Sequence, residues 1–261
     1  MHGLGNDFVI IDNNSLKAQS DIASFARRIS DRRFGIGCDQ FIVYEIKGDN
    51  RVLMSIYNQD GSSALACGNA SRCLSRLIFD QTGQREIKLD VSGREVKCLY
   101  RNDHEIEVDM GAVVFNADWI PEEEALWSQA MRFGIEPKEM IPVDVGNPHV
   151  VIFTNLAPPD MAIIGENLQK AAIFKGGINV DFAKIIDGKI ILKVWERGVG
   201  FTLACGSGAC ATFAAANNLG FVGKQSEVVF TSGSLKMYRR QNQIIMSGKA
   251  EYVFTGEYIY A

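Results

Sequence analysis

Two cysteines, Cys67 and Cys205, each stand directly before a glycine at a point where the sequence indicates that a helix begins. The segments around them are similar: residues 65–73 read LACGNASRC and residues 203–210 read LACGSGAC. The amino end of a helix has unpaired N–H groups and roughly half a positive charge, so it binds anions and lowers the pKa of a nearby thiol. The chain therefore contains two thiols, each beside an anion-binding turn.

Two such thiols suit racemisation or epimerisation by two bases. One thiolate would remove the proton from a carbon next to a carboxylate, and the opposite thiol would return a proton from the other face. The carbanion formed in between requires preorganised donors. The backbone amides around Gly68 and Asn69, and around Gly206 and Ser207, could supply them. The two thiols would titrate as a coupled pair.

The other four cysteines are interpreted differently, because a cysteine beside alanines is more often a small buried apolar residue. These four are Cys38, Cys73, Cys98 and Cys210. No pair has C-x-x-C spacing and the chain has three histidines, so neither a thioredoxin-like redox couple nor a metal site is expected. Residues 206–211 match the dinucleotide pattern G-x-G-x-x-A, but no clear βαβ unit surrounds them.

His149 and Glu196 are the titratable residues best suited to set the protonation of the two thiols. His149 follows Asn-Pro at a turn, an unusual position for a core histidine. Glu196 precedes Arg197, and the two could form only a surface ion pair, which would contribute little to stability. Glu196 nevertheless lies opposite Asn58 when the two halves of the chain are compared, which favours a functional role.

An internal repeat is expected to position these residues. Three landmarks recur in the same order, at separations of 141, 142 and 138 residues: Asn6 and Asn147, Asp39 and Asp181, and Cys67 and Cys205. The chain is therefore predicted to consist of two homologous halves, each with a sheet, a central helix and a thiol at the start of that helix. Asparagines at turns are common for backbone reasons, but their placement in both repeats favours amino-acid binding.

The apolar patterns predict the elements of these halves. Helices are expected over 21–29, with Ser20 or Asp21 as N-cap, over 69–80, and from the second cysteine turn to about residue 219. Strands are expected near 8–12, 41–45, 51–57, 86–91, 94–99, 105–110, 150–153, 190–196, 228–230 and 244–250, followed by a final segment over 252–260.

Bulk composition restricts the class of function. The 261 residues are 47% hydrophobic and 22% charged, with a net charge of -4, which argues against nucleic acid or an anionic membrane as the main partner. No apolar run approaches the roughly 20 residues of a membrane span. The amino terminus lacks the features of a secretory signal, so the expected compartment is the cytoplasm.

The sequence resembles the diaminopimelate epimerase family. The resemblance extends over nearly the whole chain, in family order, and rests on MHGLGNDF at residues 1–8, RFGIG at 33–37, CGN at 67–69, GNPH at 146–149, ERGVG at 196–200 and ACGSGAC at 204–210. The sequence departs from the usual family pattern at Phe201, Ala70 and Cys38, and none of these departures removes a proposed base.

The resemblance implies a cofactor-independent isomerase that interconverts LL- and meso-diaminopimelate for lysine and peptidoglycan synthesis. It implies an α/β (α+β) fold of two pseudo-symmetric halves, each a curved mixed or antiparallel sheet around a central helix, with the active site in the cleft between them. The halves are expected to be residues 1–114 plus 255–261 and residues 115–254. A homodimer is also implied.

The family's roles carry over to matching positions. Cys67 and Cys205 would be the two bases, with their pKa values modulated by His149 and Glu196. The expected substrate-binding residues are Asn6, Gln40, Asn58, Gly68, Asn69, Asn147, Asn179, Glu196, Arg197, Gly206 and Ser207. No metal, nucleic-acid or membrane site is implied.

Alternatives remain at this point. A proline or hydroxyproline racemase resembles the same fold and also uses paired cysteines, although the GNPH and ERGVG motifs favour diaminopimelate. A non-catalytic amino-acid-binding protein of the same fold is disfavoured by the presence of both cysteines. A thiol-redox protein is disfavoured by the lack of C-x-x-C.

Overall fold

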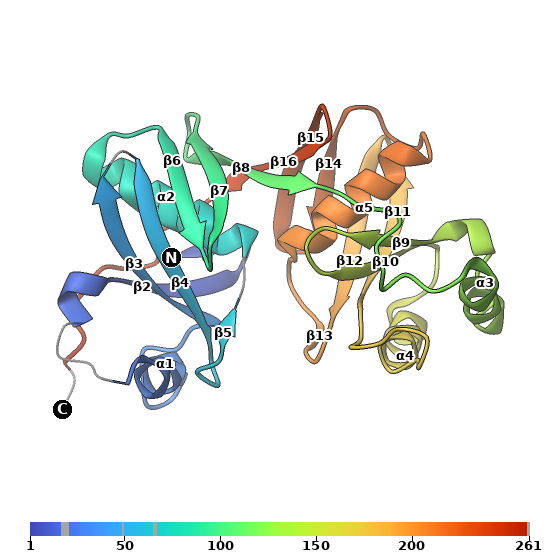
Figure 1. Cartoon of the computed structure of the whole chain (residues 1–261), viewed down its shortest axis with the longest axis horizontal. Helices are drawn as coiled ribbons and strands as arrows, with labels where there is room; N and C mark the ends of the chain where they lie inside the picture. Colours follow the sequence, from blue (N-terminus) through green and yellow to red (C-terminus); the bar gives the residue numbers. More distant parts are fainter. Residues whose placement is uncertain (17–20, 49, 65–66, 260–261) are drawn as a thin grey trace. The chain divides into compact units, whose positions relative to one another are not determined.

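The computed structural model describes residues 1–16, 21–48, 50–64 and 67–259. The chain divides into two compact units, which are described separately: unit 1 comprises residues 1–109 and 247–261, and unit 2 comprises residues 110–246 (Figure 1). The chain passes from unit 1 to unit 2 within strand β8 and returns within strand β16. These boundaries lie earlier in the chain than the 114/115 and 254/255 positions expected from the sequence.

The described part of unit 1 contains two α-helices and a sheet in the order β1-β2-β3-β4-β6-β7-β8, with β5 paired to β4. Its elements are β1 (His2–Gly3), β2 (Asn6–Asp12), η1 (Asn13–Leu16), α1 (Ile22–Ser30), β3 (Gln40–Gly48), β4 (Arg51–Asn58), β5 (Ser63–Ala64), α2 (Gly68–Thr82), β6 (Glu86–Val91), β7 (Arg94–Tyr100) and β8 (Glu105–Ala112).

Unit 2 repeats this arrangement, with the sheet order β9-β10-β11-β12-β14-β15-β16 and β13 paired to β12. Its elements are α3 (Glu123–Arg132), η2 (Pro137–Glu139), β9 (Met140–Asp144), β10 (Pro148–Phe153), α4 (Pro158–Gln169), β11 (Asn179–Ile186), β12 (Lys189–Glu196), β13 (Gly200–Phe201), α5 (Gly206–Asn218), β14 (Gln225–Phe230), β15 (Gly233–Arg240) and β16 (Gln243–Lys249).

Both sheets are mixed, as expected, and the same pairings recur in each. In unit 1, β2 and β3 run parallel, β3 and β4 antiparallel, β4 and β6 parallel, and β6 and β7 antiparallel. The strands β10, β11, β12, β14 and β15 follow the same sequence of directions in unit 2. The prediction of an α/β protein with mixed sheets is confirmed.

Strand register shows which residues of the two units are equivalent. The parallel ladder begins with Phe8 opposite Gln40 in unit 1 and with His149 opposite Asn179 in unit 2. Asn6 therefore matches Asn147, as the sequence predicted. The proposed match of Asp39 with Asp181 is wrong, because Asp181 lies two residues beyond Asn179 and so occupies the position of Ile42. The short glycine motifs were similar enough to suggest an alignment shifted by three residues.

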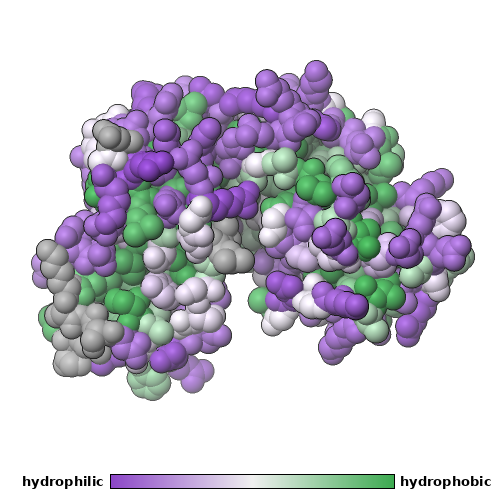
Figure 2. All heavy atoms as spheres, viewed as in Figure 1, coloured by the Kyte–Doolittle hydropathy of each residue, from purple (hydrophilic) through white to green (hydrophobic). Residues whose placement is uncertain are grey.

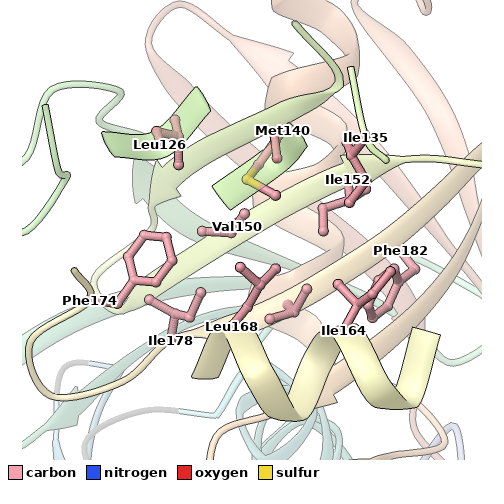
Figure 3. Close-up of a cluster of buried hydrophobic side chains, with 12 residues drawn as sticks. Leu126, Ile135, Met140, Val150, Ile152, Ile164, Leu168, Phe174, Ile178 and Phe182 are labelled. Carbon is pink, nitrogen blue, oxygen red and sulfur yellow. The ribbon is translucent and has the colours of Figure 1, made fainter. Parts of the chain in front are cut away.

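Each sheet separates two layers of packing, because side chains alternate between its faces. In unit 2, Val150 of β10 lies in a core with Leu126 of α3 and Leu168 of α4 (Figure 3). Val180 of β11 belongs to the same core. Their neighbours in the two strands, His149 and Asp181, therefore point to the opposite face of the sheet. That face packs against α5, which is buried over almost its whole length.

Unit 1 is layered in the same way. Phe25 and Ile29 of α1 form a core with Phe41 and Val43 of β3, while α2 lies on the other side of the sheet. Asp21 is the N-cap of α1, and its carboxylate accepts the Ser24 N–H at 3.0 Å. Ser20, the alternative N-cap, lies outside the described residues.

Helix α2 begins at Gly68, one residue before the expected start, and ends at Thr82; the capping residue Gly83 follows with a φ of 72°, which suits glycine. The segment 252–259 forms no strand; a single bridge joins Glu251 to His2. On the face drawn in Figure 2, hydrophilic side chains cover much of each unit. None of the described helices is long and apolar enough to cross a membrane.

Candidate active site in two half-sites

The sheet of unit 2 positions one cysteine, Cys205, against a set of polar side chains. Cys205 is the N-cap of α5, and its sulfur accepts the backbone N–H of Gly208 at 3.4 Å. Cys205 is 7% exposed. Burial, followed by the charges of Glu196 and Asp181, raises its pKa well above the ordinary value. Because this half-site favours a protonated Cys205, forming the thiolate requires a specific proton acceptor.

A row of side chains leads from Cys205 into the core of unit 2. The Cys205 Sγ lies 3.3 Å from Ser207 Oγ, which lies 3.1 Å from His149 Nε2. His149 Nδ1 lies 2.8 Å from Asp181 Oδ2. His149 and Asp181 are fully buried. We call His149, Asp181, Cys205 and Ser207 the Cys205 half-site.

Glu196 lies beside this row at the end of β12. The Thr202 hydroxyl donates to its Oε1 at 2.5 Å. Burial raises the pKa of Glu196, while the hydrogen bonds from Thr202 and Cys205 and the nearby His149 lower it. The structure thus brings both residues expected to modulate a thiol, His149 and Glu196, next to Cys205.

Asn179 and Arg197 are held at the edge of the same half-site. The Asn179 amide nitrogen donates to the Pro148 carbonyl at 3.0 Å, and its Oδ1 accepts the Arg197 N–H at 2.9 Å. The exposed guanidinium of Arg197 donates to the carbonyl of Gly176 at 2.9 Å. Asn147 is partly exposed in the turn just before β10. Of the expected binding residues, these three therefore lie in unit 2 near the row ending at Cys205.

Unit 1 builds the second half-site from amides around Cys67, the N-cap of α2. The partly exposed Cys67 thiol donates to Asn6 Oδ1 at 3.7 Å, and the Asn69 amide donates to the same oxygen at 3.2 Å. Asn69 Oδ1 in turn accepts Arg72 Nη2 at 2.9 Å, and Arg72 is fully buried. We call Asn6, Cys67, Asn69 and Arg72 the Cys67 half-site. Residues 65 and 66 of the cysteine motif lie outside the described residues.

Charged and polar neighbours fix Asn6 and the ends of strands β3 and β4. Asn6 Nδ2 donates to Asp39 Oδ2 at 3.0 Å, and Asp39 also accepts Arg32 at 2.8 Å. Gln40 Nε2 donates to Asn58 Oδ1 at 3.0 Å. The expected binding residues of unit 1 therefore lie at one end of the neighbouring strands β2, β3 and β4 and in the start of α2.

The remaining cysteines belong to the cores. Burial raises the pKa of Cys73 and of Cys98 to about 12 and also raises that of Cys38. Cys210 is fully buried in α5. Their structural interpretation is consistent with these environments. No cluster of three metal-ligating side chains occurs within the part of the chain that the structure describes.

Two residues of the half-sites were missed by sequence reasoning. Asp181 served only as a landmark of the repeat, although a carboxylate inside the apolar run of residues 178–183 was a signal that it needs a buried partner. Arg72 lay within the helix predicted over 69–80 and was given no role, because its complete burial depends on the tertiary fold. Phe201, a departure from the family pattern, packs edge-on against Trp195, with the two ring centroids 5.1 Å apart.

The fold is shared with solved structures of isomerases. A structure from Pseudomonas aeruginosa described as a predicted epimerase matches with a TM-score of 0.69 at 16% identity, over 96% of this chain and 94% of that one. A hydroxyproline epimerase from Agrobacterium vitis matches with a TM-score of 0.60 at 14% identity, over 95% of this chain and 86% of that one. At these identities the likeness concerns the fold alone.

Sequence comparison defines the family within this fold. Residues 1–116 and 141–253 match the family described as diaminopimelate epimerase. A protein from Rickettsia akari named diaminopimelate epimerase is 50% identical over 260 residues, covering 100% of this chain and 96% of that protein. The chain belongs to the diaminopimelate epimerase family, and it is an isomerase.

Proposed function

We propose that this protein interconverts LL- and meso-2,6-diaminopimelate without a cofactor, using Cys67 and Cys205 as its two bases. The observation that carries the proposal is the presence of a cysteine N-cap at equivalent positions in the two units. Membership of the family supports the substrate, since the Rickettsia akari protein named diaminopimelate epimerase matches 100% of this chain.

The chemistry required is removal and return of one α-proton. A thiolate takes the proton from the α-carbon, the electron pair of that bond passes into the carboxylate, and a thiol on the opposite face then gives its proton to carbon. At the end, one proton has moved to the first sulfur and one has left the second, so the two cysteines have exchanged states. The enzyme can then catalyse the reverse reaction directly.

The first turns of α2 and α5 would stabilise the charge that develops on the carboxylate. Each presents N–H groups that no earlier residue of the helix can accept, at Gly68 and Asn69 and at Gly206 and Ser207. Such donors are fixed before the reaction and need no reorganisation as charge builds. The amides of the two N-caps thus serve binding and catalysis together.

The remaining polar side chains would hold the two charged ends of an amino diacid. We assign Asn147, Asn179, Glu196 and Arg197 of unit 2 to this role, together with Asn6, Gln40 and Asn58 of unit 1. Arg197 is suited to a carboxylate, because its guanidinium is exposed and held by the loop carbonyls of Gly176 and Gly177. Amide side chains can accept from an ammonium group and donate to a carboxylate.

The cellular setting follows from the same family. We infer a homodimer that acts in the cytoplasm, in the synthesis of lysine and of peptidoglycan precursors. All six cysteines are present as thiols, which is consistent with a reducing compartment. Analytical ultracentrifugation of the purified protein tests the dimer.

Turnover in deuterated water tests the proposed function. The protein is incubated with LL-diaminopimelate and reductant, and both the isomer ratio and deuterium at the α-carbon are followed. We expect epimerisation with solvent deuterium in the wild type, and a loss of at least about 10³-fold in Cys67→Ala and in Cys205→Ala. Turnover of proline or hydroxyproline in place of diaminopimelate would contradict the proposed substrate. Full activity of either alanine variant would contradict the two-base mechanism.

A further inference from the structure

We propose that Asp181 is a positioning residue for Cys205, acting through His149 and Ser207 as a proton relay. The inference rests on the proposed function for its role in turnover, but the relay lies wholly within unit 2. Three consecutive contacts of 2.8, 3.1 and 3.3 Å connect the Asp181 carboxylate to the Cys205 sulfur.

The relay has two states that differ in the position of one proton. When Nδ1–H of His149 donates to Asp181, Nε2, which also lies 3.4 Å from Asn179 Nδ2, accepts the Ser207 hydroxyl proton. In this state of the relay the Cys205 S–H donates to Ser207 Oγ instead of to Glu196. When Cys205 ionises, its proton passes to Ser207 Oγ and the Ser207 proton passes to Nε2. The imidazolium then donates to Ser207, whose hydroxyl donates to the thiolate, and no proton is lost or gained.

Asp181 determines whether this transfer can occur. Its carboxylate selects the imidazole tautomer whose Nε2 is an acceptor, and it stabilises the imidazolium that forms. An Asp–His pair has this role in the Ser-His-Asp triad, where an Asp→Asn change gives the wrong tautomer and lowers kcat by about 10⁴-fold. In this protein the acceptor row ends at a thiol.

Asp181 packs closely against the first turn of α5 because residue 208 of that turn is glycine. A Cβ added at Gly208 would lie 2.8 Å from Asp181 Oδ1 and 2.8 Å from Val194 Cγ2, so only glycine permits this approach. Gly208 is in the first turn of α5, where the helix dipole favours a negative charge. Asp181 Oδ1 has no hydrogen-bond partner within the described residues, although the carboxylate is fully buried. A buried carboxylate with one unpaired oxygen is costly, which indicates a role beyond packing.

Two opposing effects of Asp181 on Cys205 make the proposal testable without substrate. The direct charge of Asp181 disfavours the thiolate, whereas the relay favours it. The other titratable groups near the thiol are Glu196 and His149. If Asp181 acted only as a nearby charge, Asp181→Asn would make Cys205 ionise at lower pH. With the relay, the same change makes Cys205 ionise at higher pH.

The measurement is the ultraviolet thiolate absorbance of Cys205 as a function of pH, in a Cys67→Ala background. We expect Asp181→Asn to move the midpoint of the Cys205 titration to higher pH by at least about one pH unit, a tenfold change in ionisation. In a Ser207→Ala background, where the relay is cut, only the direct charge remains, so Asp181→Asn should then move the midpoint to lower pH. A move to lower pH in both backgrounds, or no change in either, would overturn the relay.

Turnover supplies the second readout. In the protein with both cysteines, Asp181→Asn should lower kcat by about 10²- to 10⁴-fold and leave KM for diaminopimelate nearly unchanged. Thr212→Val is the control, since it removes a fully buried polar atom elsewhere in unit 2, on α5; it should change neither the titration nor kcat. A relay seen in the titration of a protein that does not turn over diaminopimelate would refute the proposed function alone. If Asp181→Asn does not fold, Ser207→Ala alone tests the relay. A Cys205 titration midpoint no higher in Ser207→Ala than in the Cys67→Ala background would overturn it.

Discussion

The two half-sites share one backbone plan and differ in what stands behind the thiol. In unit 2, the row behind Cys205 passes through Ser207 and His149 to the anion Asp181. In unit 1, the row behind Cys67 passes through Asn6 and Asn69 to the cation Arg72. Asn69 and Ser207 are both the second residue of their helix.

This difference gives the two thiols different routes for a proton. Hydroxyl and imidazole groups can accept and donate in turn, so a proton can leave Cys205 away from the substrate. Carboxamides orient a thiol but do not exchange protons with it at ordinary pH. The two-base reaction proposed above needs one thiolate and one thiol, and the two units share a backbone arrangement but differ in the groups that lie behind their thiols.

The largest effect is expected when the row of unit 2 is replaced by the apolar residues of unit 1. Phe8 occupies the position of His149, and Ile42 that of Asp181. His149→Phe leaves the Asp181 carboxylate buried without its partner, which should lower the free energy of unfolding by about 3–5 kcal/mol. Turnover should fall by at least about 10²-fold. Urea denaturation and the deuterium assay measure the two effects.

The double variant His149→Phe/Asp181→Ile separates stability from activity. Replacing both partners of a buried hydrogen bond by apolar residues of similar shape can be nearly neutral or stabilising. We therefore expect the double variant to regain most of the lost unfolding free energy and none of the lost activity. A double variant less stable than His149→Phe alone would show that the apolar packing of unit 1 cannot be transferred to unit 2.

A smaller effect, about tenfold, is expected in the rate at which the two thiols react with iodoacetamide at neutral pH. Cys67 is partly exposed, whereas Cys205 is almost buried and its pKa is raised by burial. The thiolate is the nucleophile, so Cys67 should be alkylated at least about tenfold faster. Peptide mass spectrometry gives both rates in one sample. Cys73, whose pKa is about 12, should react only after unfolding.

Faster reaction at Cys205 would reverse the electrostatic comparison. It would indicate that the imidazole holds Cys205 as a thiolate in the resting protein despite its burial. Cys205 would then be a thiolate, and His149 an imidazolium, before substrate binds. Repeating the alkylation in His149→Phe would distinguish this from simple access, because loss of the imidazole slows an activated thiol and does not close a path to it.

The sequence was sufficient for the elements whose pattern is strong and local. The amphipathic spacing of α1, the cysteine turns before α2 and α5, and the alternating strands β6 and β7 predicted those elements to within two residues. Helix α4 was missed because it begins with two prolines and contains a glycine, which weakens any helical pattern. The reason for Gly165 is tertiary: a Cβ there would lie 2.7 Å from the Trp195 ring.

The site was predictable as a set of motifs but not as two unequal half-sites. The cysteines, His149, Glu196 and most of the asparagines stood in recognisable segments. The role of Asp181 depends on strand register, because a shift of one residue would have turned its side chain away from α5. Only the paired strands show that unit 1 has Phe8 and Ile42 where unit 2 has the imidazole and its carboxylate.

The smallest effect should appear when Glu196 is changed to the amide that its counterpart Asn58 already carries. Burial raises the pKa of Glu196 above the ordinary 4.5, so its stabilising contribution is complete below that pH and is lost as the pH rises through the folded value. Glu196→Gln keeps an oxygen for the Thr202 hydroxyl and removes the buried charge. The variant should therefore be more stable than the wild type at neutral pH, with the difference vanishing below about pH 4. Urea denaturation at several pH values measures this, with Glu166→Gln, at an exposed position of α4, as a control expected to show little change. Equal stability at every pH would mean that the Glu196 carboxylate is as well solvated in the fold as in water. The neutral Asn58 of unit 1 would then reflect a difference in chemistry between the half-sites and not a difference in the cost of burial.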